Sequence, residues 1–158
     1  MRTCRLSKMP DVHDAATRSR NMAAIRARNT SPELIVRKGL HHAGFRYRLH
    51  TKSLPGRPDL VFAKHRAAIF VNGCFWHGHS CPSFKWPVTR QDFWRQKLQA
   101  NMERDQKNYD AIEKLGWRRA TVWECAIRGP SRVQSDYLVG ALSDWLLHGH
   151  QKFEIPNS

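Results

Sequence analysis

The stretch GCFWHGHSC, residues 73–81, concentrates side chains that bind metals. Cys74, His79 and Cys81 follow one another with the spacing C-x4-H-x-C. Thiolates and imidazoles are the ligands that zinc prefers, and a shell of four with no open position is structural. Cys125 is the candidate fourth ligand, because it follows a segment that we expect to return as a strand beside the one before the motif. The sequence therefore predicts a structural zinc site, and the alternative is buried cysteines with a surface histidine.

A second histidine of this stretch, His77, competes with His79 for the metal. Only one of them is needed if Cys125 is a ligand, and the residue types leave open which one it is. The histidine that remains free lies beside a rigid loop, where an imidazole can exchange protons near neutral pH. The alternative is a solvent-exposed histidine without a role.

Three carboxylates are candidates for a magnesium site. Asp59 lies in GRPDLVF, directly before an apolar run. Magnesium takes carboxylate and carbonyl oxygens, so Asp59 together with a backbone carbonyl of a neighbouring strand can hold it against a phosphate. Glu33 and Asp105, each on an expected helix, are candidates to complete the site. The alternatives are a turn cap for Asp59 and solvated surface groups for the other two.

The elements that must position these side chains follow from hydrophobic patterning and turn residues. Four strands are expected at residues 45–50, 59–64, 67–72 and 117–124. Four helices are expected at residues 14–29, 31–43, 89–116 and 130–149, the second with Ser31 as N-cap and Pro32 at the first helical position. This order predicts an α/β fold, in which helices cover both faces of a central mixed β-sheet. We expect a flexible N-terminal arm (1–12), one domain (13–150) and a C-terminal tail (151–158).

The charge of the chain points to an acidic partner. Its 158 residues hold 27 Lys and Arg against 13 Asp and Glu, a net charge of +14, and the excess is concentrated in the first 50 residues. Nucleic acid is favoured, because neutralised phosphates release condensed counterions. A membrane surface or a basic solubility face are the alternatives. No apolar run approaches the ~18 residues of a membrane span and no signal peptide is visible, so we expect a soluble intracellular protein.

Several motifs together resemble the very short patch repair (Vsr) mismatch endonucleases. They run in order from about residue 11 to residue 147: ATRSRNMAAIRARNT, LPGRPDLVF, IFVNGCFWHGHSC, TRQDFW, NMERD and LGWRRATVWECAIRG. The resemblance implies a restriction-endonuclease-like fold and a monomer acting in the bacterial cytoplasm on nucleoid DNA. It also implies a magnesium-dependent nick on the 5′ side of the thymine in a T:G mismatch, the product of 5-methylcytosine deamination. Other repair proteins are possible partners.

The resemblance also implies roles for single residues. Asp59 and the main-chain carbonyl of Val71 would hold magnesium, and Glu33 would contact a water of that ion. His77 would activate the attacking water while Asp105 orients its imidazole. The structural zinc ligands would be Cys74, His79, Cys81 and Cys125, which separates the two histidines.

Four apolar residues acquire a role in DNA binding by the same resemblance. Phe75, Trp76 and Trp94 would enter the duplex from the major groove, and Met22 on the basic N-terminal helix would enter from the minor groove. Stacking on such wedges offsets part of the few kcal/mol that unstacking costs, and a T:G pair is cheaper to open than a matched pair. Without the resemblance, Trp94 reads as a core residue and Met22 as part of a thin apolar stripe.

Two positions depart from the family pattern. Asn72 stands where some relatives carry a histidine, and Cys4 lies in the arm outside the match, where a free thiol without a role is the better interpretation. Two other functions remain possible: a non-enzymatic, zinc-stapled DNA-binding module, and an endonuclease of the same fold with a different or relaxed choice of mismatch.

Overall fold

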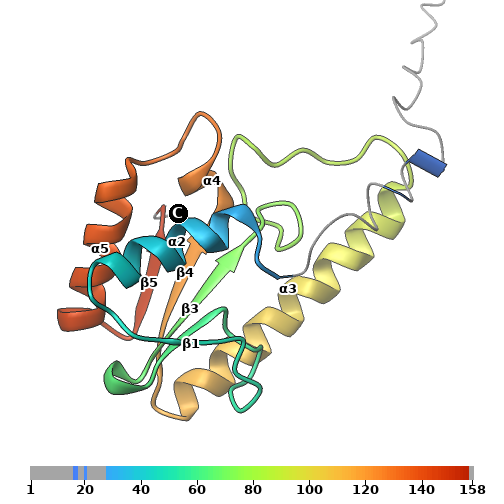
Figure 1. Cartoon of the computed structure of the whole chain (residues 1–158). Helices are drawn as coiled ribbons and strands as arrows, with labels where there is room; N and C mark the ends of the chain where they lie inside the picture. Colours follow the sequence, from blue (N-terminus) through green and yellow to red (C-terminus); the bar gives the residue numbers. More distant parts are fainter. Residues whose placement is uncertain (1–15, 18–19, 21–27, 157–158) are drawn as a thin grey trace, which may run out of the picture.

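The computed structural model describes residues 16–17, 20 and 28–156. A mixed five-stranded sheet with the order β1-β2-β3-β4-β5 forms its centre (Figure 1). The strands are β1 (Arg48–Leu49), β2 (Leu60–Phe62), β3 (Ala67–Asn72), β4 (Arg118–Trp123) and β5 (Lys152–Ile155). The first three pair antiparallel, whereas β4 and β5 run parallel to β3. The expected α/β class with a mixed sheet is confirmed.

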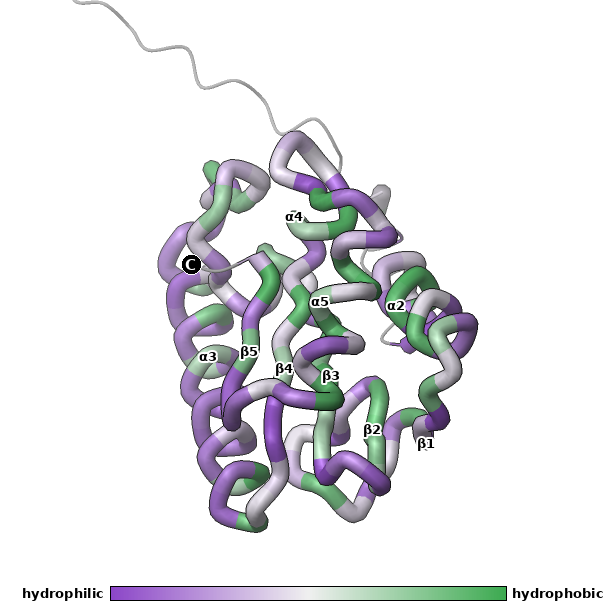
Figure 2. Tube along the Cα trace, turned by 90° about the vertical axis from the view of Figure 1, so that its left-hand side faces the viewer, coloured by the Kyte–Doolittle hydropathy of each residue, from purple (hydrophilic) through white to green (hydrophobic). Residues whose placement is uncertain are grey.

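Helices cover both faces of this sheet. Helices α2 (Ser31–His42) and α5 (Ser135–His148) pack on one face, and α3 (Gln91–Lys114) packs on the other (Figure 1). Alternation along β3 serves both faces, because Ile69 packs with α2 and α5 while Phe70 packs with Ile112 of α3. Figure 2 shows α3 as largely hydrophilic, in agreement with its two buried residues, Leu98 and Ile112.

The start of α2 differs by one residue from the prediction. Thr30, and not Ser31, is the N-cap: its Oγ1 accepts a hydrogen bond from the backbone N–H of Glu33 at 3.4 Å. Both residues are good caps, so the choice depends on where the chain enters the helix. This entry point places Glu33 in the buried first turn, where it is 2% exposed.

Three elements were not predicted, the first of them a 3₁₀ helix, η1 (Ala63–His65), which begins inside the expected strand 59–64. Strand β5 lies within residues 151–158, which the sequence assigned to a tail, and the short helix α4 (Glu124–Ile127) precedes the closing helix, which begins at Ser135 instead of near residue 130. The pairing of β5 with β4 is non-local, so four residues of pattern do not reveal it. Arg118 supports this corner, because its guanidinium donates to the carbonyls of Trp145 and Leu146 at 2.7 Å at the end of α5.

Most of the basic N-terminal helix falls outside the described residues. Ala16, Thr17 and Arg20 are helical, but Met22 and Cys4 are not among the residues that the structure describes. In the described ranges, every helix is too short or too polar to cross a membrane.

Candidate functional site

Three cysteines and one histidine converge where β3 and β4 end. One ligand atom from each of Cys74, His79, Cys81 and Cys125 lies within 4.8 Å of the others. The parallel register explains the meeting: Asn72 of β3 pairs with Trp123 of β4, and each cysteine that follows lies two residues further on. The Cys125 N–H donates to the Cys74 Sγ at 3.3 Å, and the Cys125 Sγ lies 3.6 Å from the His79 Nδ1. The expected return of Cys125 beside the motif is confirmed.

The environment of this cluster suits a soft cation. Burial raises the pKa of Cys74 to about 12 and also raises the pKa of Cys125. Burial acts in the same direction on Cys81, but hydrogen bonds, including those from the backbone N–H groups of Ser83 and Phe84, outweigh it and lower the pKa of this thiol. Burial lowers the pKa of His79, which favours the neutral imidazole. A bound cation would deprotonate the thiols and stabilise all four ligands, so the donor set fits zinc.

His77 belongs to the same loop but points to another partner. Its Nδ1 hydrogen-bonds with the Oδ2 of Asp105 on α3. The turn between the two histidines needs Gly78, which has φ +63°, and a Cβ there would lie 2.5 Å from the Met102 Sδ. The structure therefore separates the two histidines, His79 to the cysteine cluster and His77 to a carboxylate on the long helix.

His77 and Asp105 share a cavity with Asp59. It has a volume of about 540 Å³, and its lining also includes two arginines and several polar or apolar residues: Gly56, Arg57, Phe70, Val71, Asn72, Arg104, Asn108 and Tyr109. The guanidinium groups of both arginines are without a hydrogen bond or ion pair to another described residue, although the Arg57 backbone N–H donates to the Leu54 carbonyl at 3.2 Å. An open cavity that holds a histidine, two carboxylates and two free cations can receive a phosphate.

Asp59 has a raised pKa in this cavity. Burial raises its pKa from the ordinary 3.8 to about 6; the N–H of Val71, which donates to the Asp59 Oδ2 at 2.7 Å, acts against this rise. The nearby carboxylate of Glu33 raises the pKa further, whereas His50 and His77 lower it. A half-buried carboxylate whose charge is not fully compensated by its neighbours is a favourable place for a cation.

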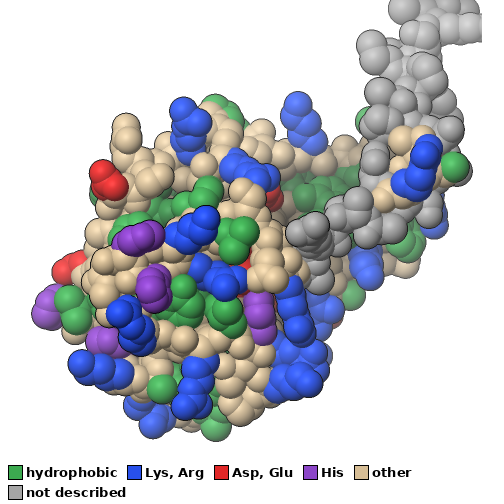
Figure 3. All heavy atoms as spheres, in the orientation of Figure 1, with side chains coloured by type: hydrophobic (Ala, Val, Ile, Leu, Met, Phe, Trp, Pro, Cys, Tyr) green, Lys and Arg blue, Asp and Glu red, His purple; other side chains and the backbone are tan. Residues whose placement is uncertain are grey.

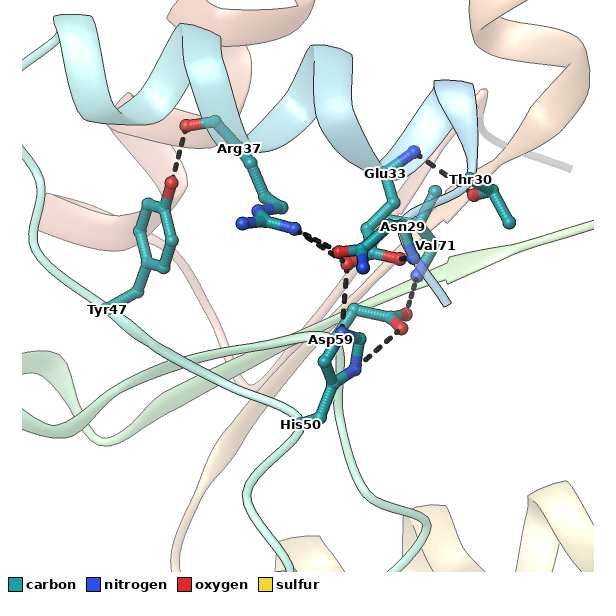
Figure 4. A network of polar contacts seen from close by, with 8 residues as sticks. All are labelled: Asn29, Thr30, Glu33, Arg37, Tyr47, His50, Asp59 and Val71. Carbon is teal, nitrogen blue, oxygen red and sulfur yellow. Dashed lines mark hydrogen bonds and ion pairs between the residues drawn. The ribbon is translucent and has the colours of Figure 1, made fainter. Parts of the chain in front are cut away.

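Glu33 is not among the residues that line the cavity. It lies on α2, and its contacts lead to Asp59 through His50 (Figure 4). Its Oε2 accepts the Asn29 N–H at 2.7 Å, and its Oε1 lies 3.5 Å from the Arg37 Nη1. The same Oε1 is 3.2 Å from the Nε2 of His50, whose Nδ1 is 3.8 Å from the Asp59 Oδ1. His50 thus bridges the two carboxylates.

Sequence reasoning missed His50. It ends the segment FRYRLH, and no motif or spacing marks it. The available signal is positional: the expected strands 45–50 and 59–64 are neighbours in the chain, and an antiparallel pairing in which residue 50 meets residue 59 brings His50 to Asp59. The structure has this pairing, with the His50 N–H donating to the Asp59 carbonyl at 3.3 Å.

Asn72, the departure from the family pattern, is tied to a tyrosine. Its Nδ2 donates to the Tyr109 hydroxyl at 2.8 Å, and the guanidinium carbon of Arg119 lies 4.1 Å from the centre of the Tyr109 ring. Burial raises the pKa of Tyr109, so the hydroxyl stays protonated. Asn72 therefore anchors one wall of the cavity.

The three aromatic residues of the described chain that were expected to enter DNA contact one another. The ring centres of Phe75 and Trp76 are 5.2 Å apart, those of Phe75 and Trp94 are 5.3 Å apart, and those of Trp76 and Trp94 are 6.1 Å apart. All three are half-buried, and Trp94 belongs to neither buried core cluster, against its interpretation as a core residue. Figure 3 shows many Lys and Arg side chains and few acidic ones on the face in view. The fourth expected wedge, Met22, lies outside the described residues.

Comparisons with known proteins show the relatives of this chain. The family model of "DNA mismatch endonuclease Vsr" matches residues 10–83. The DNA mismatch endonuclease Vsr of Escherichia coli strain K12 is 46% identical over 138 residues, which cover 87% of this chain and 88% of that protein. The type II nicking enzyme V.XorIIP of Xanthomonas oryzae pv. oryzae is 49% identical over 67% of this chain and 78% of its own length. The type II nicking enzyme V.NmeAIP of Neisseria meningitidis serogroup A is 40% identical over 86% of this chain and 99% of its own.

Proposed function

The chain belongs to the Vsr family of DNA mismatch endonucleases, and we propose that it hydrolyses one phosphodiester of duplex DNA on the 5′ side of the thymine in a T:G mismatch. The observation that carries the proposal is the cavity that joins Asp59, His77 and Asp105 beside an aromatic loop. In the same proposal the sheet and its helices form a restriction-endonuclease-like fold. The protein acts as a monomer in the cytoplasm, and its nick gives other repair proteins access to the cleaved strand.

His77 acts as the general base. In this role the His77 Nδ1–H donates a hydrogen bond to the Asp105 Oδ2, which leaves Nε2 as a proton acceptor for the attacking water. The carboxylate also stabilises the imidazolium that forms when the proton arrives. A base held in this way contributes about 10²–10⁴-fold to a hydrolysis rate.

Asp59 and the main-chain carbonyl of Val71 are the proposed magnesium ligands. The raised pKa of Asp59 supports this assignment. Its Oδ2 accepts the Val71 N–H, whereas its Oδ1 has only the 3.8 Å contact with the His50 Nδ1. When bound, magnesium neutralises charge that develops on the phosphate. Arg57 and Arg104, which line the same cavity, hold the phosphate in place. Glu33 contributes as an acceptor for a water of the ion.

The aromatic trio of Phe75, Trp76 and Trp94 stacks in the opened duplex. Its partial exposure and mutual contacts support this role, because a rigid apolar wedge loses little conformational freedom on insertion. Met22, beyond the described residues, is proposed as the opposing wedge.

The cluster of Cys74, His79, Cys81 and Cys125 holds a structural zinc ion in this proposal. Its four ligands close the shell, so no position remains for a substrate. The ion fixes the loop on which the aromatic wedges and His77 are carried.

A nicking assay tests the function. Duplexes with a T:G pair in randomised flanking sequence, duplexes with other mispairs and matched duplexes are incubated with the zinc-loaded protein, with and without Mg²⁺. The proposal expects cleavage of the thymine strand only, only at T:G, and only with the metal. Binding without cleavage under all conditions would identify a zinc-stapled DNA-binding module, and cleavage at other mispairs would identify an endonuclease with relaxed choice.

A further inference from the structure

The ring of His50 lies between two carboxylates that come from different elements. Its Nε2 is 3.2 Å from the Glu33 Oε1, and its Nδ1 is 3.8 Å from the Asp59 Oδ1 (Figure 4). The Nε2 is buried and makes no hydrogen bond to a described residue, and its contact with the Glu33 Oε1 is an ion pair only when the imidazole is protonated. A buried polar atom without such a partner requires an explanation.

We propose that His50 is a nitrogen ligand of the cation held by Asp59, that the Glu33 Oε1 binds this ion directly in place of the water contact described above, and that the site therefore binds Mn²⁺ in preference to Mg²⁺. The inference rests on the proposed function, which places a cation at Asp59. It adds a ligand and a metal preference that the carboxylates alone do not provide.

The hydrogen bonds of the two carboxylates direct one oxygen of each toward His50. Glu33 Oε2 is occupied by the Asn29 N–H, and Asp59 Oδ2 is occupied by the Val71 N–H, both at 2.7 Å. The remaining oxygens, Oε1 and Oδ1, are the ones that face the imidazole. One ligand atom from each of the three residues lies within 4.8 Å of the other two, so a single cation can reach all three.

The competing cation at this place is Arg37. Its Nη1 is 3.5 Å from the Glu33 Oε1, but it makes a shorter bond of 2.6 Å to the Asn29 Oδ1, and its side chain is 21% exposed. Arg37 can keep the bond to Asn29 while the carboxylate oxygen turns to a metal. Its contact is therefore compatible with a shared Glu33.

The backbone fixes the direction of the His50 side chain. The residue has φ +46°, and its N–H donates to the Asp59 carbonyl at the end of the β1–β2 ladder. Mn²⁺ is the weakest binder of nitrogen among the first-row divalent ions, but it accepts an imidazole more readily than Mg²⁺, which prefers carboxylate oxygen and water. A nitrogen placed here changes which ion the site selects.

The experiment measures metal binding instead of activity. Full-length, zinc-loaded protein is titrated with Mn²⁺ and with Mg²⁺ by calorimetry, and the Mn²⁺ form is examined by electron spin echo spectroscopy for coupling to a directly bound nitrogen. The variants are His50→Asn, which tolerates the left-handed backbone, His50→Gln, and His150→Asn as an exposed control far along the chain. Thermal unfolding and zinc content identify any variant that fails to fold. If one His50 variant fails to fold, metal binding is measured with the other.

We expect His50→Asn to lower the affinity for Mn²⁺ about 10-fold or more, to change the affinity for Mg²⁺ much less, and to remove the nitrogen coupling. The control should match the unchanged protein. Equal losses for both ions, or a coupling that persists in both His50 variants, would overturn the proposal.

The results that would refute the proposed endonuclease function differ from those that would refute the role of His50. A protein that shows the nitrogen coupling but does not nick T:G duplexes refutes the endonuclease proposal alone. A protein that nicks with Mg²⁺ but lacks the coupling refutes only the role of His50.

Discussion

Replacement of Asp59 by asparagine is expected to stabilise the metal-free protein while it abolishes nicking. The carboxyl group is largely withdrawn from water, with its side chain 21% exposed, and its pKa is about 6 in the folded chain against an ordinary 3.8. Above the folded pKa the native state carries a charge that burial disfavours, and this destabilises it. Below 3.8 the group is protonated in both states and the penalty is absent. The penalty therefore develops as the pH rises from about 4 to 6, and it is complete above that range.

The size of the pKa shift of Asp59 determines how much the substitution changes the free energy of unfolding. A difference of about two pKa units corresponds to about 3 kcal/mol at pH 8, and to about half of that at pH 5. Asparagine can keep an acceptor for the Val71 N–H but loses the charge assistance, which offsets about 1 kcal/mol. The net gain of about 2 kcal/mol raises Tm by roughly 4–8 °C for a chain of this size.

Thermal unfolding of the zinc-loaded protein in Mg²⁺-free buffer at pH 8 and pH 5 measures the effect. The control is Asp144→Asn, an equally small change at an exposed position of α5, which should shift Tm little at either pH. Nicking of a T:G duplex in Mg²⁺ should be lost in Asp59→Asn, with mismatch binding retained. An unchanged or lower Tm at pH 8 would refute the account of Asp59 as a half-buried charge that its neighbours do not fully compensate.

Three further changes probe the rest of the site. Asp105→Asn should lower the nicking rate by about 10²-fold in single-turnover assays with little loss of DNA affinity, because His77 keeps its place but loses its carboxylate partner; loss of binding in parallel would contradict this role. Cys125→Ser should release zinc, detected with a colorimetric chelator, and lower Tm by several degrees, whereas retention of one zinc per chain would contradict the ligand assignment. Trp94→Ala should weaken binding to T:G duplexes by about 1–3 kcal/mol and binding to matched duplexes much less, as measured by fluorescence anisotropy; equal losses would place Trp94 outside the opened step.

The parts of the fold that local pattern determines were predicted well. Strand β3 and helix α3 lie within two residues of the expected ranges, because an apolar run and a long helical periodicity are strong local signals. The meeting of Cys74 and Cys125 was also predictable, since it needs only that β3 and β4 lie side by side. Strand β5 and the bridging place of His50 depend on pairings between distant or weakly patterned segments. The free energy of such a pairing depends on contacts between the two strands, and these contacts cannot be derived from the local pattern of one sequence.

The roles of His77 and His79 cannot be assigned from residue type alone and depend on the geometry of the loop. His77 and His79 differ by two positions in a loop without regular structure, and either residue type can bind zinc or transfer protons. The left-handed turn at Gly78 directs one inward and the other toward α3, so the chemistry of each is assigned by the backbone. The loop itself has few buried apolar side chains to hold this turn, and the cysteine cluster supplies the constraint instead. It follows that the orientation of His77 is fixed from two sides, by the cluster through Gly78 and by Asp105. Loss of Asp105 alone should therefore reduce catalysis, whereas loss of the cluster should displace the base and the aromatic wedges together.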